Sequence, residues 1–107
     1  MSWFSNLFKE PESVAPNCVS YALYCATAWS VKKRLPARIV DSHNDEGKGH
    51  WQAQGWDGEK WQWLQKKTDD KVVVGNAENN FPYIKYMNMD EVFKFWIDAN
   101  PWAIKGD

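Results

Sequence analysis

The chain has 107 residues and a formal net charge of −1. This length fits a single domain with a modest core, and the near-neutral charge argues against a nucleic acid or an anionic membrane as the partner. Eight Trp, five Phe and four Tyr supply enough large apolar side chains to exclude a disordered chain.

Targeting and cysteine usage both favour the cytoplasm. The first residues, MSWFSNLFKEP, lack the cationic start of a secretory signal, and no apolar stretch is long enough to span a bilayer. Cys18 and Cys25 are the two cysteines. On one helix their Cα atoms would lie about 10 Å apart, whereas a disulfide requires less than about 7 Å. We therefore expect two thiols and a reducing compartment.

The first predicted element is a helix that runs from Cys18 to about Lys33, with Asn17 as its N-cap. Lys32, Lys33 and Arg34 suit the negative end of the helix dipole, and Pro36 ends the pattern. The helix has an apolar stripe of mostly small residues, which predicts close packing against another element. The stripe consists of Cys18, Ala22, Cys25, Ala26 and Trp29.

Strands are predicted next, joined by polar turns. Asp57-Gly58 is a strong hairpin signal between the second and third of them, and residues 44–49 form a polar, glycine-containing loop. The segment 76–86 is predicted to be irregular. The predicted strands are ARIVDSH (37–43), HWQAQGW (50–56), EKWQWLQ (59–65) and the short KVVVG (71–75).

A second helix, MDEVFKFWIDA (89–99), follows Asn88 as its N-cap and ends before Pro101. The order of elements predicts an α+β fold in one domain over 1–107, with its core at about 17–75. In this fold an N-terminal helix packs on a three- to four-stranded antiparallel sheet, and the second helix is added at the C-terminal end.

Period-two alternation places Trp61, Trp63 and Gln65 on one face of the third strand. We expect the two tryptophans to be buried on the core side and Gln62 to point outward. The alternative is that these tryptophans, with Trp51 and Trp56, form a flat platform for stacking on sugars.

Cys18 is the candidate nucleophile. A thiol in the first turn of a helix lies at the positive end of the dipole, beside unpaired amides, and both favour the nucleophilic thiolate. The base must be His43 or His50. His50 begins a strand directly after the glycine-rich loop, where it is open to substrate, and Gln65, at the end of the next strand, is the candidate that orients it.

The run DSHNDEGKGH (41–50) combines two histidines with three acids and therefore raises the possibility of a metal site. Its spacing matches no standard zinc motif, and its glycine is misplaced for a calcium loop. The run is predicted to be a solvated loop, and neither a metal nor another cofactor is expected.

Three stretches resemble one known family: NCVSYALYCATAW, LPARIV with Arg38, and GHWQAQGWDGEKWQWLQKKT. Their order and spacing over residues 17–68 resemble the transglutaminase-like branch of the papain-like cysteine enzymes. The resemblance implies that Cys18 is the nucleophile and His50 the base. It puts Gln65 where the family usually has an aspartate, and Asp69 or Asp70 would replace Gln65 if the chain bent back.

Two functions follow. The first is a cysteine peptidase, amidase or transglutaminase-like hydrolase, in which a thiol-dependent acyl transfer or hydrolysis acts on a peptide, isopeptide or other amide bond. The second is a non-catalytic binding module on the same fold, with the Trp-rich hairpin as its contact surface. The substrate, the oligomeric state and the choice between hydrolysis and transfer are not specified by the sequence.

Overall fold

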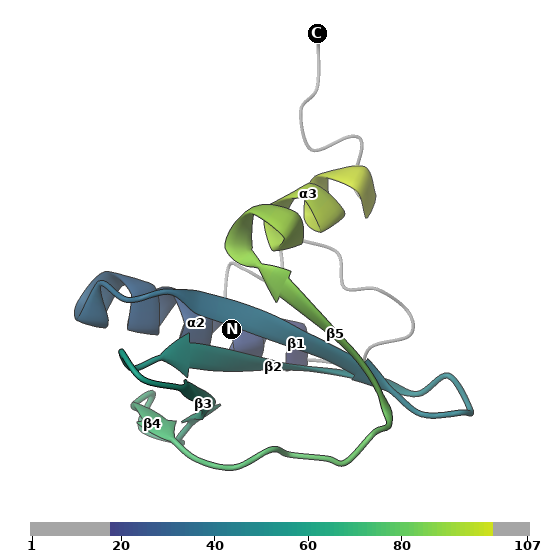
Figure 1. Ribbon diagram of the computed structural model, residues 1–107, viewed down its shortest axis with the longest axis horizontal. Helices are drawn as coiled ribbons and strands as arrows, with labels where there is room; N and C mark the ends of the chain where they lie inside the picture. The colour runs from purple at the N-terminus through teal and green to yellow at the C-terminus, as the bar shows by residue number, and fades with distance from the viewer. Residues whose placement is uncertain (1–17, 100–107) are drawn as a thin grey trace, which may run out of the picture.

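The computed structural model describes residues 18–99, which form two helices and five strands (Figure 1). The predicted cap Asn17 lies outside the described residues. In chain order the elements are α2 (Cys18–Lys33), β1 (Ala37–His43), β2 (Gly49–Trp56), β3 (Trp61–Lys66), β4 (Val72–Val74), β5 (Tyr83–Asn88) and α3 (Met89–Ala99).

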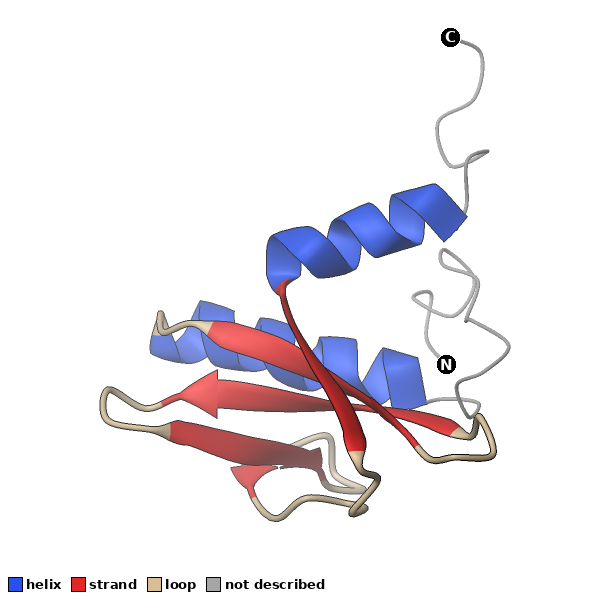
Figure 2. Ribbon diagram, turned by 45° about the vertical axis from the view of Figure 1, so that its right-hand side comes forward, coloured by secondary structure: helices blue, strands red, loops and turns tan. Residues whose placement is uncertain are grey.

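The strands form one antiparallel sheet in the order β4-β3-β2-β1-β5. The helix α2 lies along one face of this sheet (Figure 2). The helix α3 begins where β5 ends. The core is the layer between the sheet and the two helices. It contains the predicted small-residue stripe of α2, together with Ile39, Trp51, Ala53, Leu64, Met87 and Val92.

The small residues of α2 allow the helix to lie close to the sheet. Cys18, Ala22, Cys25 and Ala26 are all buried, as the stripe predicted. Trp29 packs on Gly55 of β2, where a Cβ would collide with the indole ring, and its Nε1–H donates to the carbonyl of Trp56 at 3.0 Å. Within residues 18–99, neither helix is long and apolar enough to span a membrane.

The predicted α+β class, antiparallel sheet and both helices are confirmed. The prediction that residues 76–86 are irregular is wrong for their last part, because Tyr83–Asn88 forms β5 and pairs with β1 from His43↔Tyr83 to Arg38↔Asn88. The start of this strand was missed because the residues just before it are typical of turns. These residues are Asn79, Asn80 and Pro82. Asn88 caps α3 as predicted: its Oδ1 accepts the N–H of Glu91 at 2.8 Å, and Glu91 Oε1 accepts the N–H of Asn88 at 3.1 Å.

The prediction for the faces of β3 is wrong. Leu64 is 1% exposed and belongs to the core, whereas Trp61 and Trp63 are half-buried on the opposite face. Alternation defines which residues share a face but not which face meets the core. Leu64 packs in one core cluster with the buried residues of α2 and therefore lies on the α2-facing side of β3.

Aromatic rings and one guanidinium line the face of the sheet that is turned away from α2. The Arg38 guanidinium lies 4.1 Å from the ring centre of Trp61 and 4.0 Å from that of Tyr86, so it is held between them. Its Nε donates to Gln54 Oε1 at 2.8 Å. These contacts join side chains from β1, β2, β3 and β5 on this face.

Candidate functional site

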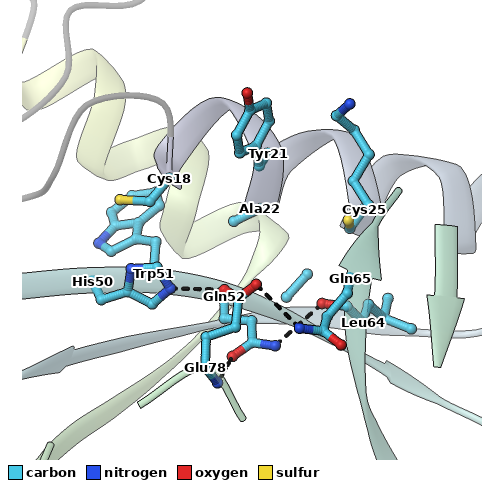
Figure 3. A pocket seen from close by; sticks show the side chains of 12 residues that line it. Cys18, Tyr21, Ala22, Cys25, His50, Trp51, Gln52, Leu64, Gln65 and Glu78 are labelled. Atoms are coloured by element: carbon cyan, nitrogen blue, oxygen red, sulfur yellow. Dashed lines mark hydrogen bonds and ion pairs between the residues drawn. The ribbon is translucent and has the colours of Figure 1, made fainter. Parts of the chain in front are cut away.

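A cavity of about 280 Å³ extends from the first half of α2 into the gap where β2 and β3 separate (Figure 3). Its lining includes Trp51 and Ala53 from the α2-facing side of β2, and His50 and Gln52 from the other side. The helix supplies Cys18, Tyr21, Ala22 and Cys25 to its wall. The sheet and the chain after β4 supply His50, Gln52, Leu64, Gln65 and Glu78, among others. All three predicted site residues, Cys18, His50 and Gln65, therefore line one cavity.

Cys18 is the first residue of α2 and is 7% exposed. Its position in the first turn places the thiol near the positive end of the helix dipole. Neither cysteine forms a disulfide, and both lie within residues 18–99, as the helix geometry predicted. Figure 3 shows the Cys18 thiol at the end of the cavity that also holds His50.

The His50 imidazole is held by a carboxylate. Its Nε2 lies 2.8 Å from Oε1 of Glu78, a residue 28 positions further along the chain. When Nε2–H donates to this carboxylate, Nδ1 of the neutral ring is left as the proton acceptor. Figure 3 shows the His50 ring joined to the Glu78 carboxylate by this interaction.

The prediction that Gln65 orients His50 directly is wrong, because Glu78 bonds to Nε2 of the imidazole and the side chain of Gln65 bonds to Glu78 and to the N–H of Asn76 instead. Gln65 acts one step further away: its Nε2 donates to the other oxygen of Glu78, Oε2, at 3.4 Å. Asp69 and Asp70, the predicted alternatives, are engaged with the backbone N–H of Lys71 and with the ammonium of Lys66 instead. Gln65 thus belongs to the site as a support of the carboxylate.

The residues that carry Glu78 are attached to both strands that flank the cavity. We call residues 75–78 the Glu78 segment. Gly75 N–H donates to the carbonyl of Trp63 at 2.8 Å, and a Cβ on Gly75 would collide with the side chain of Gln65. Gln52 of β2 donates to the carbonyl of Asn76 at 2.9 Å and accepts the N–H of Glu78 at 2.9 Å.

The second cysteine has a different environment. Cys25 is 3% exposed, and burial, with a smaller contribution from the charge of Glu78, raises the pKa of its thiol to about 11. A thiol with this pKa is protonated at neutral pH and is a poor nucleophile. Cys25 is therefore a core residue that lines the far part of the same cavity.

The other histidine takes no part in the cavity. His43 is exposed at the end of β1, and its ring stacks on Tyr83 at 4.9 Å between ring centres. Among the residues described, 18–99, no group of three or more His, Cys, Asp or Glu side chains is placed to hold a metal ion. The arrangement therefore combines a thiol and an imidazole in the lining of one cavity with a carboxylate bonded to that imidazole.

Sequence reasoning missed Glu78. It lies in NAENN, between β4 and β5, with no strand or helix around it that would predict its direction. One signal was available, since Glu78 is the sole acidic residue between Asp70 and Asp90. An isolated acid in a connection that leads from one sheet edge to the other is a natural candidate for a buried or bonded carboxylate.

Comparisons of this chain with models of known families, with curated proteins and with solved structures find no match in any of the three.

Proposed function

We propose that the chain is a thiol-dependent enzyme that transfers or hydrolyses the acyl group of an amide bond. Cys18 is the nucleophile, His50 is the base, and Glu78 orients the imidazole with Gln65 as its support. One observation carries the proposal: a single cavity contains the thiol at the helix start and an imidazole whose Nε2 is bonded to a carboxylate.

The reaction proceeds in two halves. In the first, Nδ1 of His50 takes the proton of the Cys18 thiol, and Sγ attacks the carbonyl carbon of the amide. The tetrahedral oxyanion then collapses, the C–N bond breaks, and the amine leaves with the proton from His50. A thioester on Cys18 remains.

In the second half, water attacks the thioester while His50 takes one of its protons. The C–S bond breaks, the carboxylic acid leaves, and the thiolate of Cys18 regains its proton from His50. An amine in place of water gives a new amide, which is the transferase outcome. Glu78 stabilises the imidazolium that forms in both halves.

The resemblance of residues 17–68 to the transglutaminase-like branch of the papain-like cysteine enzymes supports the proposal, since it assigns Cys18 and His50 the same roles. The substrate class is then a peptide, isopeptide or other amide. The absence of a disulfide between Cys18 and Cys25 fits a reducing compartment, and we infer that the protein acts in the cytoplasm.

The test is formation of the acyl-enzyme. The full chain is mixed with p-nitrophenyl acetate, and the intact mass and the modified peptide are determined by mass spectrometry. We expect acetylation of Cys18, lost in Cys18→Ala and strongly slowed in His50→Ala, and unchanged in the control Cys25→Ala. Acetylation that is absent from wild type, or independent of His50, would refute the catalytic assignment.

A non-catalytic binding module is the second candidate. The face of the sheet that is turned away from α2 supports it. Trp61 and Trp63 are only half-buried there, beside the Arg38 guanidinium. Rings exposed beside a cation suit stacking on a planar or sugar ligand. In that case wild type would show no acetylation of Cys18, and Trp63→Ala would abolish the binding of a ligand that Cys18→Ala retains.

A further inference from the structure

The side-chain amide of Gln52 is buried and hydrogen-bonded to the backbone of the segment that carries Glu78. Gln52 lies on β2, two residues after His50, and is 5% exposed. Its Nε2 donates to the carbonyl of Leu64 on β3 at 3.3 Å and to that of Asn76 at 2.9 Å. Its Oε1 accepts the N–H of Glu78 at 2.9 Å.

These hydrogen bonds lie where the backbone pairing between β2 and β3 ends. The backbone pairing of β2 and β3 covers Trp56↔Trp61 to Gln54↔Trp63, and Gln52 lies just beyond it. There the side-chain amide replaces a neighbouring strand for residues 76–78, because it donates to the carbonyl of Asn76 and accepts the N–H of Glu78. It thereby attaches the Glu78 segment to β2 at the level of His50.

We infer that Gln52 is a positioning residue that holds Glu78 against His50. This inference rests on the proposed function, since it concerns the same imidazole and carboxylate. Glu78 lies in a connection without regular structure, and its side chain is 39% exposed, so its reach to His50 depends on where its backbone is held. The hydrogen bond from Glu78 N–H to Gln52 fixes that backbone directly.

A neighbouring glutamine separates this role from ordinary packing. Gln54 lies on the same strand and face and is also 5% exposed, but its side chain bonds to Arg38. Loss of Gln54 removes a side-chain hydrogen bond from the same face of β2, the one to Arg38, without touching the Glu78 segment. Gln54→Asn is therefore the matched control for Gln52→Asn.

The test measures the rate at which iodoacetamide alkylates Cys18 from pH 5 to pH 9 in the full chain. The variants are Gln52→Met, Gln52→Asn, Gln54→Asn, Glu78→Gln and His50→Ala. Gln52→Asn keeps the amide but is one methylene too short to reach residues 76 and 78 together. We expect both Gln52 variants to slow labelling at pH 6 by about twofold to tenfold, the range that loss of a hydrogen bond allows.

The shape of the pH profile provides the specific readout. The pH at half-maximal labelling should rise in Gln52→Met and Gln52→Asn in the same direction as in Glu78→Gln, and Gln54→Asn should match wild type. In the double variant Gln52→Asn/Glu78→Gln, the second change should add little, because Gln52 acts through Glu78. A wild-type profile in both Gln52 variants, with slow labelling in His50→Ala and Glu78→Gln, overturns the role of Gln52 and leaves the proposed function intact.

Wild-type labelling in His50→Ala and Glu78→Gln as well would instead overturn the proposed function, and the role of Gln52 with it. A second measurement does not depend on the stability of the variants. Hydrogen exchange of the Glu78 amide, followed by NMR in the wild-type chain, should show protection because that N–H donates to Gln52. Exchange at the rate of an open amide would also overturn the inference.

Discussion

The carboxylate of Glu78 lies 2.8 Å from Nε2 of the His50 imidazole. The pair joins the start of β2 to the connection between β4 and β5. Because this contact spans the two halves of the chain, it offers the most direct point at which to test the site.

Substitution of Glu78 by Gln should slow alkylation of Cys18 at pH 6. The change keeps the size of the side chain but removes the charge that stabilises the imidazolium, and the imidazolium in turn favours the thiolate. We expect a loss of about three- to tenfold, since the pair is partly exposed. Labelling by iodoacetamide, followed by peptide mass spectrometry, measures it.

His43→Ala is the control for this prediction, because His43 stacks on Tyr83 outside the cavity. It should label at the wild-type rate. If His43→Ala slows labelling as much as Glu78→Gln does, the effect comes from general destabilisation rather than from the charge of Glu78.

Cys18 should react well before Cys25 at every pH from 6 to 9. Burial raises the pKa of Cys25 to about 11, so its thiol stays protonated over this range and gains reactivity only as the pH approaches that value. Limited iodoacetamide treatment and mapping of the two peptides check the order. Equal labelling of both cysteines at pH 7 would mean that the thiol of Cys18 is not more reactive than that of a buried core cysteine.

Truncation on the two faces of β3 should have unequal costs. Leu64 is 1% exposed in the core, so Leu64→Ala should reduce the free energy of unfolding by about 2–5 kcal/mol. Trp61 is half-buried on the other face, and Trp61→Ala should cost less than about 2 kcal/mol. Urea unfolding of the two variants provides the comparison, and equal costs would contradict the assignment of faces.

Asp57 should stabilise the hairpin between β2 and β3 in a pH-dependent way. Its pKa is lowered from 3.8 to about 2 by hydrogen bonds from the backbone of Lys60, the side chain of Gln62 and the backbone of Glu59. Since the folded-state pKa lies below the ordinary value, the contribution is complete above pH 3.8 and is lost as the pH falls toward 2.

The measurement for Asp57 is the melting temperature of wild type and Asp57→Asn as a function of pH. The wild type should be the more stable of the two at neutral pH, and the gap should narrow between pH 3.8 and about pH 2. A difference in melting temperature that stays constant over this pH range would show that the charge of the Asp57 carboxylate does not stabilise the turn.

Local signals in the sequence predicted the elements that have clear periodicity or turn chemistry. The small-residue stripe of α2, the Asp57-Gly58 turn and the Asn88 cap each depend on neighbouring residues, and all three are found. The faces of β3 were not predictable in the same way. Alternation is symmetric, and the bulkier tryptophans favoured the wrong side.

The residues of the candidate site differ in the same way, because some have local signals in the sequence and one does not. Cys18 and His50 have local signals, a helix start and a strand start, and the structure places both on one cavity. Glu78 has none, because its position follows from bonds to Gln52 and Gln65, which are distant in sequence. Gln65 was found as a neighbour of the site, but a single sequence could not distinguish direct contact with the imidazole from contact through Glu78.

The attachment of the Glu78 segment to both β2 and β3 has a consequence for the order of folding. α2, β1, β2 and β3 follow one another closely and can assemble from near-neighbour contacts, whereas β5 returns across the molecule to pair with β1. Closing that longer loop costs more chain entropy and is expected to come later. The Glu78 segment bonds to β2 and β3 and not to β5, so a refolding chain should form this attachment before β5 pairs with β1. In pulse-labelling hydrogen exchange, protection of the Glu78 amide should therefore precede protection of the β5 amides.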